Sequence, residues 1–344
     1  MTEWTQRAHV LADHAVSGVL GHVSSLHFDT MSELLWVGSA SGQLTSHTGA
    51  LPTLPRYTSL AAHGAPKQPR HVRGILSDDK FIISLSEGRV CASQRQGLGR
   101  WSMQIEDHAP GVALAGLCAS PQSASSDIIV GGAAPNSHDA LFALHSISGR
   151  IVRSAVSDGT VTQLRKGSRY LCVGTEQGTI QLHDPRSLRA EHKLPAHHGG
   201  LIDLQTDGHL IYSIGWTLRQ GRRIPEPFIK AHDVRTMQAL IPTPLTAPGG
   251  PALLAIHPKK SSIVAVATPQ SQFQLVDIHQ PGQSQFYSMP SAALITALAF
   301  SSSAEALAFG ESDGSVRVWT SDAHANTLRI NAYPTPPVSM PDYA

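Results

Sequence analysis

The stretch GESDGSVRVWT at residues 310–320 decides the fold of this 344-residue chain. It contains the end of a strand, a tight Asp-Gly turn at Asp313, and an alternating strand that closes on Trp319. Earlier segments align with this copy, and successive closing positions lie 38 to 52 residues apart. A period of about 40–45 residues with a Trp-Asp-like ending is typical of a four-stranded propeller blade. The closing positions are Thr48, Gln94, Ser146, Asp184, Asp233, Asp277 and Thr320.

Seven such units predict an all-β fold, a seven-bladed WD-repeat β-propeller over residues 1–326. In each unit an apolar inner strand precedes a second apolar strand, an alternating third strand and a looser outer strand. Residues 4–11 have no unit of their own, so we expect this N-terminal strand to complete the last blade and close the ring. The predicted blades lie near residues 22–62, 72–106, 111–157, 161–196, 200–245, 251–289, and 295–320 plus 4–11.

Several residues of these units are expected to have structural roles only. Small residues end the second strands because neighbouring strands crowd together near the axis of a propeller. Histidines that precede inner strands are expected to form hydrogen bonds within their blade, as in WD-type repeats. The glycines are Gly38, Gly131, Gly174, Gly215 and Gly310, and the histidines are His22, His63 and His197. The closing and turn residues with a predicted structural role are Trp319, Asp313, Asp184, Asp233 and Asp277.

Residues 327–344 are predicted to begin a proline-rich linker, which suggests that the chain was cut from a longer protein. The prolines cannot continue a sheet, and such a composition favours an extended chain. They are Pro334, Pro336, Pro337 and Pro341.

The charge and cysteine content exclude several classes of protein. With 26 Lys and Arg against 25 Asp and Glu, the net charge of +1 gives no general attraction to nucleic acid or to an anionic membrane. No apolar run is long enough to predict a membrane span, and no signal-peptide core is present. Cys91, Cys118 and Cys172 each lie in an apolar run, as expected for reduced, buried cysteines. We therefore expect an intracellular protein.

An insertion in the fifth unit is the main candidate site. From the glycine to the closing position there are 18 residues in this unit, against 10 in the first, fourth and seventh. The extra residues, WTLRQGRRIPEP at 216–227, lie between the second and third strands, whose connections share one face of a propeller. Trp and Arg are enriched at interface hot spots and also suit contacts with nucleic acid. The candidate interaction residues are Trp216, Arg219, Gln220, Arg222 and Arg223.

The alternative for this insertion is a solvated loop whose arginines pair with nearby carboxylates. The same choice applies to a second basic cluster, which precedes the second inner strand and is expected on the same face. This cluster contains Lys67, Arg70, His71 and Arg73, of which Arg70 and Arg73 are candidate contact residues.

No motif in the sequence marks a catalytic or metal site. The 19 histidines lack partners at zinc spacing, and neither a nucleophile elbow nor a phosphate-binding loop occurs. We therefore predict no catalytic residue, no metal and no cofactor in this chain.

An ordered set of short segments makes the resemblance to one family specific. The chain resembles the N-terminal WD-repeat domain of the nuclease-bearing subunit of the poly(A)-nuclease deadenylation complex, from about Leu34 to Trp319. The segments are ELLWVG (33–38), RYTS (56–59) with His63 following, SRYLC (168–172), GWTLRQ (215–220), PFIKAHDVR (227–235) and LAFG (307–310). This resemblance adds Arg56 and Tyr57 to the candidate contact residues.

The resemblance implies a non-catalytic scaffold at the start of a cytoplasmic poly(A)-specific 3′→5′ exoribonuclease. Its implied partners are the pseudokinase regulatory subunit of the complex and poly(A) covered by poly(A)-binding protein. Whether the domain contacts RNA directly is left open. The alternatives are a peptide-binding WD-repeat adaptor of a ubiquitin-ligase or chromatin complex, and an enzymatic propeller.

Overall fold

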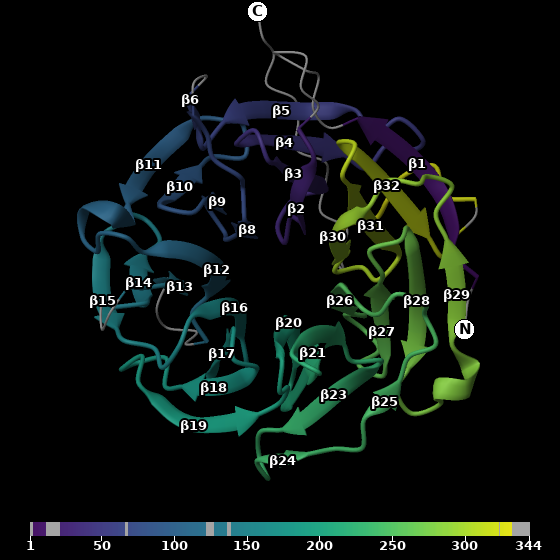
Figure 1. Ribbon diagram of the computed structural model, residues 1–344. Coiled ribbons are helices and arrows are strands. Elements are labelled where there is room, and N and C mark those ends of the chain that lie inside the picture. Colours follow the sequence, from purple (N-terminus) through teal and green to yellow (C-terminus); the bar gives the residue numbers. More distant parts are fainter. Residues whose placement is uncertain are drawn as a thin grey trace, which may run out of the picture.

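The computed structural model describes residues 3–11, 21–65, 68–121, 127–135, 139–322 and 324–331. Seven of the antiparallel sheets that these residues form stand like blades around a common axis (Figure 1). The only described helices are two short 3-10 turns, at Ile105–Asp107 and Pro281–Gln283. Within the described ranges, no helix is long and apolar enough to cross a membrane. The predicted seven-bladed, all-β propeller is therefore confirmed.

Six blades follow the chain from the inner strand to the outer one. Blade 1 has β2 (Val23–Phe28), β3 (Leu34–Ser39), β4 (Gln43–Thr48) and β5 (Arg56–Ala61). Blade 2 has β8 (Gly74–Ser77), β9 (Ile82–Leu85), β10 (Arg89–Ser93) and β11 (Gly99–Gln104). Blade 3 has β12 (Ala113–Ala119), β13 (Asp127–Ala133), β14 (Leu141–His145) and β15 (Ile151–Ala155). Blade 4 has β16 (Val161–Lys166), β17 (Leu171–Thr175), β18 (Thr179–His183) and β19 (Ala190–Pro195).

The other blades carry the irregular features of the ring. Blade 5 has β20 (Gly200–Asp207), β21 (Leu210–Arg219) and β23 (Phe228–Asp233), and its outer strand is split into β24 (Gln238–Ala239) and β25 (Thr243–Pro244). An additional strand, β22 (Arg222–Pro225), pairs with β21. Blade 6 has β26 (Leu253–Ile256), β27 (Ile263–Ala267), β28 (Gln272–Asp277) and β29 (Gln285–Ser288). A small pair, β6 (Gly64–Ala65) and β7 (Gln68–Pro69), connects blades 1 and 2.

Blade 7 joins the two ends of the chain. It has β30 (Ile295–Phe300), β31 (Ala306–Glu311) and β32 (Ser315–Thr320), and its outer strand is β1 (Thr5–Leu11). The antiparallel register runs from Thr5 opposite Thr320 to Leu11 opposite Ser315. The N-terminal strand thus covers the edge of β32 and closes the ring, as the sequence predicts (Figure 1).

Close packing between blades explains the glycines that end the second strands. A Cβ atom on Gly310 would lie 2.3 Å from Cγ1 of Val23 in blade 1. A Cβ atom on Gly174 would lie 2.1 Å from Cδ2 of Leu201 in blade 5. At these two positions the inner strand of the next blade packs directly on the glycine, where a larger side chain would force the blades apart.

The predicted structural residues act in turns and in the core. Asp313 accepts a hydrogen bond from the backbone N–H of Ser315 (2.8 Å), and the other three aspartates make similar turns. Trp319 is 8% exposed and packs on the rings of Phe273 and Tyr287, at centroid distances of 5.1 and 5.6 Å. The other turn contacts are Asp184 with the N–H of Arg186, Asp233 with that of Arg235, and Asp277 with that of His279.

The expected hydrogen bonds of the histidines form at two of the three positions. Nε2 of His63 lies 2.8 Å from Oγ of Ser84, and Nε2 of His197 lies 3.0 Å from Oγ of Ser213. His22 differs, because its ring packs edge-to-face on the ring of His71, at a centroid distance of 5.3 Å.

The predicted domain boundary at residue 326 is too early. Thr327 forms a β-bridge with Ala50, and the buried side chains of Leu328 and Ile330 belong to the core between blades 7 and 1. The carboxylate of Glu33 accepts hydrogen bonds from the N–H groups of Ile330 (2.6 Å) and Asn331 (3.2 Å). Residues 327–331 are therefore part of the propeller. The rest of the predicted linker, residues 332–344, lies outside the described residues.

Candidate interaction surface

The alternation of antiparallel strands gives the ring two distinct faces. Connections between second and third strands, and between successive blades, emerge on one face, which we name the insert face. Connections between first and second strands, and between third and fourth strands, emerge on the opposite face. The insertion of blade 5 and the residues around Arg70 both lie on the insert face, in agreement with the sequence analysis.

The insertion is a β-hairpin instead of an irregular loop. β21 continues past the core of blade 5 and pairs with β22, from Trp216 opposite Pro225 to Arg219 opposite Arg222. The two turn residues, Gln220 and Gly221, have φ angles of 49° and 76°. Two successive left-handed residues are typical of the type I′ turn, whose twist matches that of the flanking strands. The candidate residues are therefore carried on a defined, projecting element.

The three arginines of the hairpin have different surroundings. Arg223 Nη2 lies 3.4 Å from Oε1 of Glu176 in blade 4, and both side chains are about half exposed. Arg219 and Arg222 are directly opposite each other, are exposed, and form no ion pair with any residue that the structure describes. Like charges directly opposite on a sheet are unfavourable. The solvated, paired interpretation thus suits Arg223, whereas Arg219 and Arg222 present two uncompensated cations.

The hairpin also exposes apolar side chains. Leu218 is 53% exposed and Ile224 is 41% exposed, although both lie on an ordered strand. Trp216, at the base of the hairpin, is partly buried. Ile224 lies on the same side of the hairpin as Arg219 and Arg222, whereas Leu218 lies on the side of Arg223.

A buried polar network holds the base of the hairpin. Nδ1 of His197 lies 3.1 Å from Oε2 of Glu226, the first residue after β22, and Nε2 of His197 lies 3.0 Å from Oγ of Ser213. Lys230 Nζ lies 2.6 Å from the same Glu226 oxygen and donates a hydrogen bond to the Ala196 carbonyl. Burial, with a smaller contribution from Lys230, lowers the pKa of His197 to about 4, so the ring is neutral near pH 7.

The order Ser213, His197 and Glu226 is that of a hydrolase triad, but its position argues against catalysis. Ser213 is 0% exposed, so no substrate can reach its hydroxyl group. The network is therefore a structural anchor. Sequence analysis identified His197 but missed Glu226 and Lys230, since only the folded blade brings residues 29 and 33 positions away to this histidine.

The remaining predicted contact residues do not join the hairpin. Arg70 and Arg73 lie between blades 1 and 2, on the other side of the ring from β21 (Figure 1). A guanidinium nitrogen of Arg70 lies 3.6 Å from Glu106, and one of Arg73 lies 3.5 Å from Glu87. These ion pairs agree with the interpretation of the cluster as a solvated turn whose arginines pair with nearby carboxylates.

The two candidates from blade 1 are also separate from the hairpin. Tyr57 is 9% exposed and packs in the core with Leu34 and Trp36, so its ring does not form a contact surface. Arg56 is exposed at the start of β5, directly after the turn that follows β4 on the opposite face. The structure therefore concentrates the candidate surface in residues 216–225.

Comparison with known proteins identifies the family. The profile described as PAN2 N-terminal matches residues 8–320. The chain belongs to the PAN2 N-terminal family. The resemblance seen in the sequence is thereby confirmed.

Two curated relatives of this PAN2 N-terminal domain are fungal. It is 30% identical over 299 residues to the PAN2-PAN3 deadenylation complex catalytic subunit pan2 of Schizosaccharomyces pombe, covering 87% of this chain and 26% of the relative. It is 31% identical over 309 residues to the corresponding subunit of Aspergillus oryzae, covering 89% and 25%. The chain spans about a quarter of the length of these relatives.

A solved structure shows the same fold. The Neurospora crassa Pan2 WD40 domain matches with a TM-score of 0.82 at 24% sequence identity, covering 95% of this chain and 98% of that one. At this level of identity the likeness establishes the propeller architecture alone.

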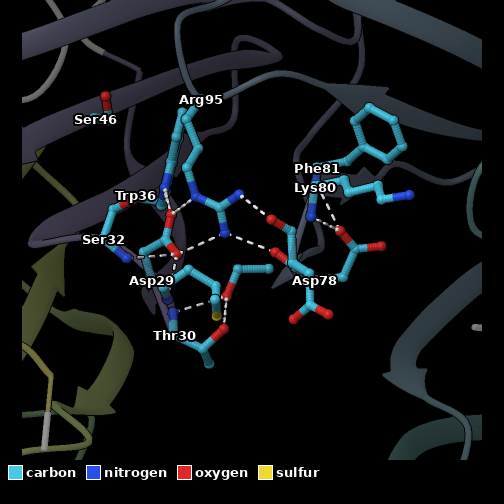
Figure 2. Close-up of polar contacts among 12 residues, drawn as sticks. Asp29, Thr30, Ser32, Trp36, Ser46, Asp78, Lys80, Phe81 and Arg95 are labelled. Carbon is cyan, nitrogen blue, oxygen red and sulfur yellow. Dashed lines mark hydrogen bonds and ion pairs between the residues drawn. The ribbon is translucent and has the colours of Figure 1, made fainter. Parts of the chain in front are cut away.

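On the opposite face, the PAN2 N-terminal domain contains a buried ion pair between blades 1 and 2 (Figure 2). Asp29 is 0% exposed and accepts hydrogen bonds from Arg95 Nε (2.8 Å), Arg95 Nη2 (2.9 Å) and Trp36 Nε1 (3.0 Å). Arg95 Nη2 also donates to the backbone carbonyl of Asp78 (2.6 Å). Because every strong donor of the cluster is directed at a protein acceptor, we assign it to the joining of blades and not to ligand binding.

Asp29 and Arg95 are a pair that sequence reasoning missed. They are separated by 66 residues and lie in different units of the repeat, so no local spacing connects them. The only sequence signal is an aspartate at the end of an inner strand, seven residues before a tryptophan.

Groups suited to metal or thiol chemistry are not assembled on the described part of the domain. Across the described ranges there is no cluster of three or more His, Cys, Asp or Glu residues that could hold a metal ion. All three cysteines are free and buried. Burial raises the pKa of the Cys118 and Cys172 thiols to about 12, so neither is a thiolate near neutral pH.

Proposed function

We propose that this domain is the scaffold of a cytoplasmic poly(A)-specific 3′→5′ exoribonuclease that acts in messenger-RNA deadenylation. In this proposal the ring binds the pseudokinase regulatory subunit of the deadenylation complex and poly(A) covered by poly(A)-binding protein. The family assignment supports the proposal, as do the relatives named as catalytic subunits of the PAN2-PAN3 deadenylation complex.

The observation that carries the proposal is the projecting hairpin β21–β22. It presents exposed Leu218 and Ile224 together with the unpaired Arg219 and Arg222, and its base is fixed by buried hydrogen bonds. A rigid, exposed element of this composition is suited to binding a partner. A ring that holds a partner and a ribonucleoprotein beside a tethered nuclease raises the effective concentration of substrate at that nuclease.

Co-purification tests this scaffold role. The chain is freed of bound RNA with ribonuclease, purified away from that enzyme, and mixed with the pseudokinase subunit and separately with poly(A)-binding protein assembled on poly(A). We expect both to be retained, and we expect the triple variant R219E/R222E/R223E to bind at least one of them about tenfold more weakly, because it reverses the charge of the hairpin.

A charge-matched control separates a local effect from a global one. Arg169, Arg186 and Arg189 are exposed on the opposite face of blade 4, and their replacement by Glu should leave binding unchanged. Unaltered binding by the hairpin variant would reject the hairpin as the contact surface. Retention of an unrelated peptide, with neither expected partner bound, would instead support the peptide-adaptor alternative.

A further inference from the structure

The tip of the β21–β22 hairpin has the geometry of a binding site for oxyanions. Arg219 and Arg222 flank the two-residue turn and are directly paired across the strands. Side chains opposite each other in an antiparallel pair project from the same side of the sheet. Their two guanidinium groups can therefore approach one anion, or two anions joined together, and a bound anion would relieve their mutual repulsion.

No carboxylate of the described residues forms an ion pair with either of these two arginines. The carboxylate that contacts the hairpin, on Glu176, is paired with Arg223, which belongs to the other side of the strand pair. Glu226, at the base, is 7% exposed and is already paired with Lys230 and His197. Neither carboxylate is thus available to Arg219 or Arg222.

The hairpin fixes the backbone positions of these two arginines before any ligand arrives. A two-residue turn with left-handed Gln220 and Gly221 fixes the register, and the network around Glu226 fixes the base. A site that is ordered in advance loses less conformational entropy on binding than a flexible arginine-rich loop would.

We propose that Arg219 and Arg222 contact the phosphodiester backbone of single-stranded RNA. Planar guanidinium groups match the geometry of phosphate oxygens. The tip, residues 218–223, carries no aromatic ring on which a base could stack, so contact with the backbone is favoured over recognition of bases. This inference rests on the proposed function, which places poly(A) beside the domain.

Fluorescence anisotropy with labelled oligoadenylate tests the proposal on the full chain. Each phosphate contact contributes about 0.7 to the slope of log K against log salt concentration for single strands. We expect R219A/R222A to reduce that slope by about 1.4 between about 50 and 200 mM salt, and to weaken binding about tenfold or more at the low end. Oligouridylate should bind with the same slope, because the backbone is common to both.

Two further variants make the outcome specific. R219K/R222K keeps both charges but not the planar geometry, and should retain the slope while binding a few-fold more weakly. R186A/R189A removes two charges from the opposite face and should match the wild type. An unchanged slope in R219A/R222A, or no RNA binding by the wild-type chain, would overturn the proposal. So would a slope change seen only with an acidic polypeptide such as polyglutamate, which would indicate a protein ligand.

Failure of this inference is distinguishable from failure of the scaffold role. The co-purification with the pseudokinase subunit contains no RNA and reports a contact between proteins, whereas the anisotropy experiment contains RNA and no partner. If the pseudokinase subunit were not retained but RNA still bound through the hairpin, the scaffold role would be rejected and the RNA contact would stand. If the pseudokinase subunit were retained but RNA did not bind, the RNA contact would be rejected and the scaffold role would stand.

Discussion

Buried histidines make the stability of individual blades sensitive to pH. His63 and His197 are 2% and 5% exposed, and each joins its ring to a serine of the second strand. Burial is the main cause that lowers the pKa of each to about 4, with nearby cations adding to it. Burial thus keeps His197, which has the position of the base in a hydrolase triad, neutral near pH 7.

We predict that the free energy of unfolding decreases as the pH falls from about 6.5 towards 4. The unfolded chain protonates these histidines near their ordinary pKa of about 6.5, whereas the folded protein does so only near pH 4. The unfolded state therefore binds more protons in this window, and each histidine lowers stability by up to about 1.4 kcal/mol per pH unit. Urea unfolding at pH 7 and pH 5 measures the effect.

An exposed histidine provides the control for this experiment. His279 is exposed, and H279Q should leave the pH dependence unchanged. Equal stability at pH 7 and pH 5 in the wild type would contradict the assignment of neutral, buried histidines.

At the scale of elements, two segments from opposite ends of the chain join blades 7 and 1. β1 pairs with β32, and residues 324–331 pack across the neighbouring turns. Arg7 in β1 donates a hydrogen bond to the carbonyl of Ala325 (3.0 Å), so the two segments also contact each other. Ring closure therefore has a second component beyond the N-terminal strand.

We predict that both segments are needed for full stability. A chain ending at residue 322 loses the burial of Leu328 and Ile330, which corresponds to roughly 3–6 kcal/mol. Removal of residues 1–11 should lower the melting temperature sharply, because it exposes the edge of β32. Thermal melts of these two truncations, beside a chain ending at residue 331, measure the contribution of each segment.

The chain ending at residue 331 is the matched control, since it keeps every described contact of the C-terminal segment. It should have the same melting temperature as the 344-residue chain. If the chain ending at 322 did so too, the segment would have no part in closure.

The local sequence pattern was enough to predict the strands and turns. Contacts between residues far apart in the sequence could not be predicted from it. Asp313 and Trp319 mark a turn and a strand within a few residues, so the number and order of the blades followed from the sequence. The segment at 327–331 was misassigned because nearby prolines suggested a linker, whereas its contacts come from Glu33 and Ala50. For Tyr57, the resemblance indicated a surface role, but neighbours supplied by two blades bury the ring.

The sequence predicted where the candidate site lies on the propeller, but it did not predict that the insertion forms a β-hairpin. Unequal spacing between repeats located residues 216–227, and the alternation of blade connections gave the correct face. Gln220-Gly221 is a weak sequence signal for a type I′ turn, which is why a loop was the default expectation. The difference between Arg223 and the two unpaired arginines depends on Glu176 in another blade, and no local pattern contains that information.

At the scale of the whole molecule, the described residues do not bring together an accessible set of catalytic or metal-binding groups. Within the described part, the Ser213–His197–Glu226 arrangement is sealed from solvent and no group of acidic or histidine ligands gathers in one place. The activity of longer relatives therefore has to be tested on this chain directly.

We predict that the purified chain does not shorten poly(A). Incubation of labelled poly(A) with the chain and Mg²⁺, followed by denaturing gel electrophoresis, should show an unchanged length distribution. An unrelated nuclease serves as the positive control. Shortening that persists through further purification and depends on the metal would show that this domain is itself catalytic.

The fixed position of Asn331 has a consequence for assembly. Glu33 and the turns of blades 7 and 1 hold the chain on the face away from the hairpin. A partner bound at these turns would have the whole thickness of the disc between itself and Arg219. It would dock from the opposite side to a partner on the hairpin, so neither would take the space of the other, whichever arrived first.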